Sequence, residues 1–210
     1  GNVEIAQRTL YPRDDLVDLT VTPDAPLTFT LRIRIPGWAR GECVPGGLYR
    51  YLDSEQSQND PVQDIRLRIN DEDVPLKLEA GYATLRRTWK KGDYVQLKIP
   101  TPIRRVVADE KVVADRGRVA VERGPLVYCL EEADNKQPVD RLMLPDGVEL
   151  KTTLESDLLG GLVVIEAEGA VATEEDGAWK QQKATLRLIP YYAWNHRGNG
   201  KMEVWIPLRI

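Results

Sequence analysis

The chain has 210 residues, of which 42% are hydrophobic and 30% are charged, and its formal net charge is −4. This length suits one large β domain or two domains of roughly 100 residues each. The acidic balance argues against a nucleic-acid or anionic-membrane partner, because such ligands select a basic face. No apolar run reaches the roughly 18 residues of a membrane span. The first residues lack the features of a signal peptide, so the cytoplasm and the periplasm of a bacterium both stay open.

The first half of the sequence alternates apolar and polar residues, which predicts half-buried strands. Three stretches show this pattern: Val17–Val21, Leu27–Ile35 and Ile65–Ile69. Asn70–Asp73 predicts a turn, and Ser54–Asp60 predicts a polar, mobile insertion between strands. Tyr82–Trp89 and Tyr94–Ile99 each alternate around a short charged turn, so together they predict a hairpin.

Two prolines at positions 100 and 102 predict a boundary, because proline cannot sit in a central strand. This places one domain at residues 1–102 and another at residues 103–210. In the second, Asp115–Glu131 predicts two short strands separated by a Gly-Pro turn. The run Leu126–Leu130 is apolar on both faces, which is typical of a strand buried between two layers.

Gly161–Ala167 and Ala184–Ile189 predict further strands, and Thr173–Gly177 predicts a solvated loop between them. No stretch carries the 3.6-residue periodicity of a long amphipathic helix. The sequence therefore predicts an all-β fold made of two consecutive antiparallel β-sandwich domains.

Residue types that do catalytic chemistry are sparse in this sequence. The single histidine, His196, lies in a segment rich in Gly and Asn, where a structural or solvent-facing role is the usual one. Cys43 and Cys129 are far apart; a disulfide between them stays open, and Cys129 is expected to be a buried small hydrophobe. Adjacent carboxylates such as Glu131-Glu132 are interpreted as solvated surface. No catalytic residue and no metal ligand is predicted.

Aromatic side chains are better candidates for binding, because sugars stack on exposed aromatic faces. Trp38 follows a Pro-Gly turn, and Tyr191, Tyr192 and Trp194 gather beside His196 in one loop. Two interpretations are weighed for this set: direct sugar contact, or packing against a neighbouring domain. The other large aromatics, which are expected to fill the cores, are Trp89, Tyr128 and Trp205.

Four sequence blocks carry a resemblance to a known family. They are TFTLRIRIPGWAR, GYATLRRTWKKGDYVQLKIP, GRVAVERGPLVYCLEEADN and IPYYAWNHRGNGKMEVWIP. The first two resemble the middle domain of glycoside hydrolase family 127, the β-L-arabinofuranosidase family, and the last two resemble its C-terminal domain. The blocks run in order from Thr28 to Pro207, whereas Gly41–Asn59 is longer than the link expected there.

The resemblance implies a retaining glycosidase that acts on L-arabinofuranosides in an (α/α)6 barrel, with a cysteine nucleophile and a zinc ion held by a glutamate and cysteines. None of those motifs occurs in this sequence, so the resemblance implies a non-catalytic accessory region without a cofactor of its own. Its expected partner is the barrel of the same polypeptide, and plant-type arabinose-containing glycans are a further expected ligand. The alternatives are a carbohydrate-binding module and a structural or interaction pair of β-sandwiches, and a homodimer also stays open.

Overall fold

The computed structural model describes residues 1–52 and 61–209, and the predicted insertion Ser54–Asp60 lies outside these ranges. The helices of the described residues are short 3₁₀ turns, and the strands pair antiparallel, so the all-β prediction is confirmed. The chain divides into two compact units. Residues 1–43 and 61–101 form the first unit, and residues 44–52 and 102–209 belong to the second.

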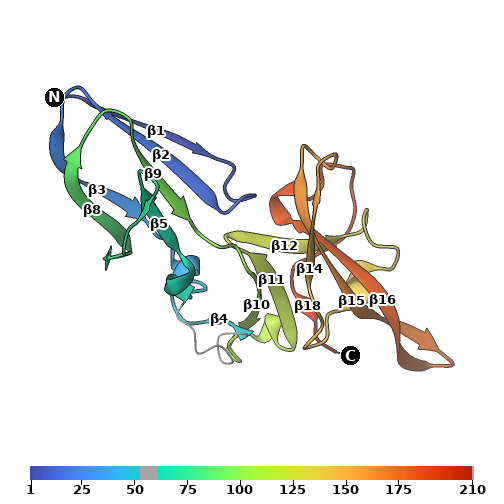
Figure 1. Ribbon diagram of the computed structural model, residues 1–210. Coiled ribbons are helices and arrows are strands. Elements are labelled where there is room, and N and C mark those ends of the chain that lie inside the picture. The colour runs from blue at the N-terminus through green and yellow to red at the C-terminus, as the bar shows by residue number, and fades with distance from the viewer. Residues whose placement is uncertain (53–60, 210) are drawn as a thin grey trace. The chain divides into compact units, whose positions relative to one another are not determined.

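The first unit is a sandwich of two antiparallel sheets (Figure 1). One sheet has the order β1 (Val3–Thr9), β2 (Leu16–Pro23), β9 (Asp93–Lys98), β5 (Arg66–Ile69) and β6 (Glu72–Asp73). The other has the order β3 (Leu27–Arg34), β8 (Tyr82–Trp89) and β7 (Leu78–Glu79), and the 3₁₀ turns η1 (Gly37–Arg40) and η3 (Pro61–Asp64) complete the unit. The apolar faces of both sheets meet in one core that includes Val21, Leu67, Leu85, Trp89 and Val95. The alternating pattern thus does form strands with one buried face.

The predicted hairpin of Tyr82–Trp89 and Tyr94–Ile99 is wrong. β8 pairs with β3 and β7, whereas β9 pairs with β2 and β5, so the turn between them carries the chain from one sheet to the other. Both strands bury one alternating face, and a pair of facing sheets satisfies that pattern as well as a hairpin does.

Asp93 fixes this turn between the sheets. Its carboxylate accepts hydrogen bonds from the Lys90 amide and the Asn70 side chain, each at 2.9 Å. Burial opposes ionisation, but these hydrogen bonds and the charge of Arg87, 4.0 Å away, together hold the pKa of Asp93 below its ordinary value. The predicted turn at Asn70–Asp73 is confirmed in part: Asn70 and Asp71 have positive φ and form a two-residue hairpin loop, whereas Glu72–Asp73 forms β6.

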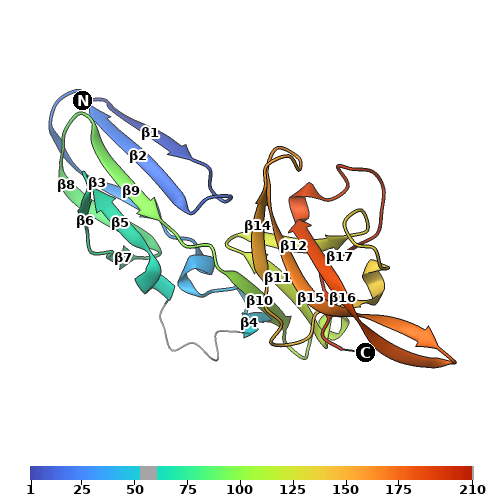
Figure 2. The same cartoon turned by 45° about the vertical axis from the view of Figure 1, so that its right-hand side comes forward.

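The second unit is built on one long antiparallel path of strands (Figure 2). The order is β13 (Leu142–Met143), β15 (Leu162–Glu175), β16 (Ala178–Pro190), β12 (Leu126–Glu131), β11 (Arg118–Arg123), β10 (Ile103–Ala108) and β4 (Tyr49–Tyr51). β14 (Lys151–Glu155) pairs with β15, β17 (Met202–Glu203) with β12, and β18 (Ile206–Pro207) with β11. The 3₁₀ turns are η4 (Val113–Asp115), η5 (Val139–Arg141) and η6 (Tyr191–Ala193).

The prediction that Leu126–Leu130 is buried on both faces is confirmed. Tyr128 and Leu130 lie in the larger core of the second unit, together with Leu186 and Leu188. Cys129, on the opposite face of β12, lies in a smaller core. The turn between β15 and β16 corrects a second expectation: Thr173–Glu175 continues β15, and only Asp176 and Gly177, both with positive φ, form the turn. The Asp-Gly pair is the usual two-residue hairpin loop, so the strands extend to it.

Gly169 lies where β15 passes closest to its neighbours. A Cβ added there would overlap the Met143 carbonyl oxygen and lie 2.6 Å from Leu186 Cδ1. The absence of a side chain therefore allows β13 and the core to approach β15 at this point.

Residues 44–52 lie in the second unit although they interrupt the first unit in sequence. β4 pairs with β10, with Tyr51 opposite Val106, and Tyr51 is buried. The Arg104 guanidinium lies 4.6 Å from the centre of the Tyr51 ring, and the Tyr51 hydroxyl donates to Glu122 at 3.3 Å. Burial raises the pKa of Glu122 in spite of this hydrogen bond. Strand pairing and aromatic packing thus hold this segment on the second unit.

Candidate functional site

Trp38, the first of the predicted contact residues, lies in the first unit. It is half-buried in η1, packs against the core of that unit, and stacks on Tyr11 with ring centres 6.4 Å apart. Burial raises the pKa of Tyr11 although Trp38 hydrogen-bonds to it. Trp38 therefore belongs to a different unit from the other predicted contact residues, which all lie in the second unit.

Tyr191, Tyr192 and Trp194 form an aromatic surface on the second unit. Tyr191 and Tyr192, in η6, are 46% and 59% exposed, whereas Ala193 between Tyr192 and Trp194 is buried in the smaller core. Trp194 is half-buried against that core, and its ring stacks on Tyr191 with centres 6.1 Å apart and planes 19° from parallel. The loop thus presents two aromatic faces to solvent on a packed base.

A cluster of ionised side chains, Glu131, Asp134 and Arg197, holds this aromatic loop. Arg197 donates to Asp134 Oδ1 at 2.8 Å, and its second amino group donates to both Glu131 and Asp134. Glu131 also accepts the Asn195 amide at 2.9 Å. Glu131 is only 1% exposed, so both ends of this ion pair are largely removed from water. The hydrogen bond to Asp134, followed by that to Glu131, raises the pKa of Arg197 against the opposing effect of burial.

Asn135 and Arg187 extend the Arg197 cluster into β16. The Asn135 amide donates to the Glu131 and Arg187 carbonyls, each at 2.9 Å, and its oxygen accepts the Arg187 amide at 3.0 Å. The Arg187 side chain lies 3.6 Å from Asp134 and pairs with Glu155. These hydrogen bonds and ion pairs connect three parts of the chain to β16: the end of β12, the segment after it and the aromatic loop.

The interpretation of Glu131 as solvated surface is wrong, whereas Glu132 beside it is exposed. Glu131 shares a strand face with Cys129, and that face is buried in the smaller core. The sequence does indicate that Glu131 is buried. Side chains alternate along β12, and a strand that is apolar on both faces also buries the residue that ends it. The partner, Arg197, lies 66 positions away, and nothing in the local pattern indicates it.

The two cysteines and the histidine occupy ordinary structural surroundings. Neither cysteine forms a disulfide within the described ranges, and Cys129 is fully buried. Burial, with the nearby charges of Glu131 and Asp134, raises the pKa of Cys129 to about 12, which keeps it a neutral thiol. The His196 side chain is turned to the backbone, with Nδ1 3.2 Å from the Ala193 oxygen and 3.1 Å from the Trp194 oxygen.

No group of three or more His, Cys, Asp or Glu side chains in residues 1–52 and 61–209 is placed to hold a metal ion. None of the helices in those same ranges is long and apolar enough to cross a membrane.

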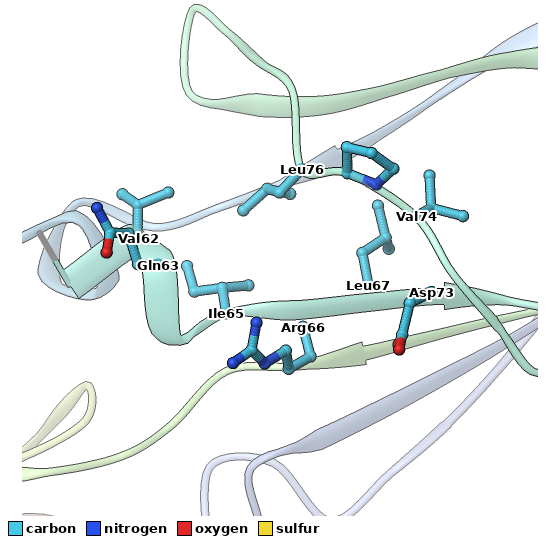
Figure 3. A pocket seen from close by; sticks show the side chains of 9 residues that line it. Val62, Gln63, Ile65, Arg66, Leu67, Asp73, Val74 and Leu76 are labelled. Carbon is cyan, nitrogen blue, oxygen red and sulfur yellow. The ribbon is translucent and has the colours of Figure 1, made fainter.

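The first unit contains an apolar hollow of about 530 Å³ beside β5. Figure 3 shows Ile65 and Leu67 pointing from β5 toward the segment that carries Leu76, and Arg66 and Asp73 also line the hollow. It is lined mainly by aliphatic side chains, and Asp73 is the one carboxylate among its described lining residues. Val74 and Pro75 also line a second, more basic groove.

Comparison with known proteins gives a consistent result along the whole chain. Residues 1–101 match the model of the β-L-arabinofuranosidase GH127 middle domain, and residues 103–207 match that of the glycoside hydrolase family 127 C-terminal domain. The chain is 31% identical over 223 residues to a non-reducing end β-L-arabinofuranosidase from Bifidobacterium longum subsp. longum, covering 98% of this chain and 30% of that protein.

Solved structures agree with these matches. The GH127 β-arabinofuranosidase BT3674 is similar with a TM-score of 0.89 and 38% identity, over 99% of this chain and 32% of that one. A GH127 β-L-arabinofuranosidase from Geobacillus stearothermophilus T6 is similar with a TM-score of 0.80 and 38% identity, over 98% of this chain and 30% of that one. The chain thus spans about a third of the length of these relatives. With family models matched on both sides of residue 102, the chain belongs to glycoside hydrolase family 127.

Proposed function

We propose that this chain is the non-catalytic accessory region of a longer β-L-arabinofuranosidase-like glycosidase, and that it packs on and supports the catalytic part of that polypeptide. The observation that carries the proposal is coverage: 98% of this chain matches only 30% of the Bifidobacterium longum enzyme. The matched models describe a middle and a C-terminal domain, so the chemistry is expected elsewhere in the longer protein. The zinc ion and the cysteine nucleophile that the sequence resemblance implies would also belong to that other part.

Activity and association measurements test the accessory role together. The isolated chain should not hydrolyse an aryl β-L-arabinofuranoside, and turnover above a buffer blank would contradict the proposal. The remainder of the native reading frame, produced separately, should bind the chain in size-exclusion chromatography and gain thermal stability from it. Separate elution of the two parts, with an unchanged melting temperature, would equally refute the supporting role.

A second candidate function is direct binding of an arabinose-containing glycan by the aromatic loop. The observation that favours it is the exposure of Tyr191 and Tyr192 on a base that the Arg197 cluster fixes. Rings that are held before binding lose little side-chain entropy when a sugar stacks on them, which favours affinity.

Affinity electrophoresis in gels that contain plant arabinan tests glycan binding. The chain should migrate more slowly in such gels, and replacing both Tyr191 and Tyr192 by Ala should weaken binding roughly tenfold. Trp179→Ala is the matched control, because Trp179 is 52% exposed in the same unit but lies on β16 away from η6. Equal loss in the control variant, or no retardation of the parent chain, would eliminate this function.

A further inference from the structure

The two sheets of the first unit are unequal, and the smaller one leaves a strand edge open. The five-stranded sheet faces a sheet of only three strands, in which β8 pairs with β3 along its whole length. On its other side β8 pairs only with β7, through Tyr82 and Ala83. From Leu85 onward, no strand of the described chain pairs with that side of β8.

Backbone amides along the open side of β8 are oriented to pair with another strand. The Thr84 amide points to that side, because it donates to the Lys77 carbonyl at 3.3 Å. Amides two residues apart in a strand point the same way, so the Arg86 and Thr88 amides lie on the same open edge. Both residues are exposed, and neither amide has a backbone partner within residues 1–52 and 61–209.

A groove of about 680 Å³ runs along this edge, and its lining is basic. The four cationic residues are Lys77, Arg86, Arg87 and Lys90, whereas no Asp or Glu of the described chain lines it. Arg87 lies 4.0 Å from Asp93, but Lys77 and Arg86 have no carboxylate partner in the described ranges. Glu79, which lies outside this lining, accepts the Thr84 hydroxyl at 3.3 Å. The groove is therefore a local basic site on a chain whose formal net charge is −4.

The floor of the groove is apolar. Ile69, Val74, Pro75 and Leu85 line it from the side of the core. Side chains of a strand alternate between faces, so Arg86 lies on the outer face of the sheet and Leu85 on the inner one. A strand added beside β8 would meet the apolar floor with one set of side chains and Arg86 with the other. Its complementary pattern is apolar residues alternating with Asp or Glu.

We propose that an extended acidic segment of the longer polypeptide, outside these 210 residues, adds as a strand to the open edge of β8. The inference rests on the accessory role proposed above, and identifies where the rest of the protein engages this chain. Open edges with unpaired backbone groups are the template for this kind of addition. The basic lining selects acidic side chains, and the part of each relative that this chain does not cover is long enough to supply the segment. A tethered segment has a roughly millimolar effective concentration, so it needs only weak intrinsic affinity.

The first experiment uses the 210-residue chain and a synthetic peptide, acetyl-Glu-Val-Glu-Val-Glu-Val-amide. NMR titration should show saturable binding with a dissociation constant of roughly 1 mM or lower. Amide exchange at Arg86 and Thr88 should slow by roughly tenfold at saturation. The amides of Thr30 and Arg32, on the opposite open edge of the same sheet, serve as internal controls and should not change. Absence of protection at Arg86 and Thr88 would overturn strand addition.

Two variants and one competing ligand test whether the peptide binds by strand addition at this basic edge. Arg86→Glu should weaken peptide binding roughly five- to tenfold, whereas Arg32→Glu, on the same sheet face of β3, should not. A peptide N-methylated at every second residue, in the register that pairs with β8, should not bind. If a hexamer of galacturonate binds as tightly as the peptide and leaves the amides exchanging, the groove is a polyanion site and the proposal is wrong.

The second experiment compares this chain with the longer polypeptide from its native reading frame. Arg86 and Thr88 should already be protected in the longer protein, and the peptide should no longer bind to it. If the separately produced parts associate but these amides still exchange, strand addition fails while the accessory role stands. If the peptide binds the chain and the longer protein leaves the edge open, the segment comes from another molecule and the assignment to the same polypeptide is overturned.

Discussion

Replacing Arg197 by Met tests whether the Arg197 cluster stabilises the second unit. The substitution keeps most of the side-chain volume but leaves Glu131, which is 1% exposed, without its cation. Removing one partner of a buried ion pair costs about 3–5 kcal/mol. The Arg197 side chain is 22% exposed, and Arg187 remains 3.6 Å from Asp134, so about 2–4 kcal/mol is expected here. That is a large fraction of the roughly 5–15 kcal/mol that stabilises a domain.

Urea titration followed by NMR measures this loss in each unit separately. Resonances of the second unit should lose intensity at a lower urea concentration in Arg197→Met, and those of the first unit should not move. Lys201→Met is the matched control, because it removes an exposed ion pair with Asp140 in the same unit and should barely change the midpoint. Adding Glu131→Gln to Arg197→Met should recover part of the loss, since it removes the unpaired charge. An equal shift in both units, or a loss under about 1 kcal/mol, would refute the reasoning.

Three further predictions concern other positions. Gly169→Ala should destabilise the second unit by about 2 kcal/mol or more in the same titration, whereas Gly200→Ala, with nothing closer than 3.4 Å to the new methyl group, should cost far less. The folded state lowers the pKa of Asp93, so its carboxylate contributes to the free energy of unfolding. This contribution is fully present above the pKa of the unfolded state, near about 4, and is lost as pH falls through the pKa of the folded state. The stability gap between the parent and Asp93→Asn should therefore narrow when urea titrations are repeated below pH 4; a constant gap would contradict this. Iodoacetamide at pH 8 should modify Cys43 well before Cys129, whose burial raises its pKa to about 12, and mass spectrometry that finds equal labelling would disprove it.

Local pattern predicted the strands well because each one carries its own evidence. Leu126–Leu130 is apolar at every position, and the structure buries both of its faces. Partner choice is different, since alternation gives the face of a strand and not its neighbour. Tyr82–Trp89 and Tyr94–Ile99 are consecutive and matched in pattern, yet Asp93 turns the chain into the facing sheet.

The aromatic loop likewise has one feature that the sequence predicts and one that it does not. The sequence already gathers Tyr191, Tyr192 and Trp194 within a few residues, so their proximity was predictable. Their fixed arrangement depends on Arg197 reaching Glu131 across 66 positions, which no local pattern encodes. A charged pair of this kind is visible only when both side chains are placed, because either residue alone resembles solvated surface.

By itself, the sequence determined the all-β class and, through its four blocks, the family to which the chain belongs. Both depend on residues close together in the chain, where period-2 alternation and turn residues act directly. Only the tertiary structure decided that residues 44–52 join the second unit, that Glu131 pairs with Arg197, and that one edge of β8 is open and basic. Each of these depends on which distant segments meet, and that choice is made by packing and backbone pairing over the whole chain.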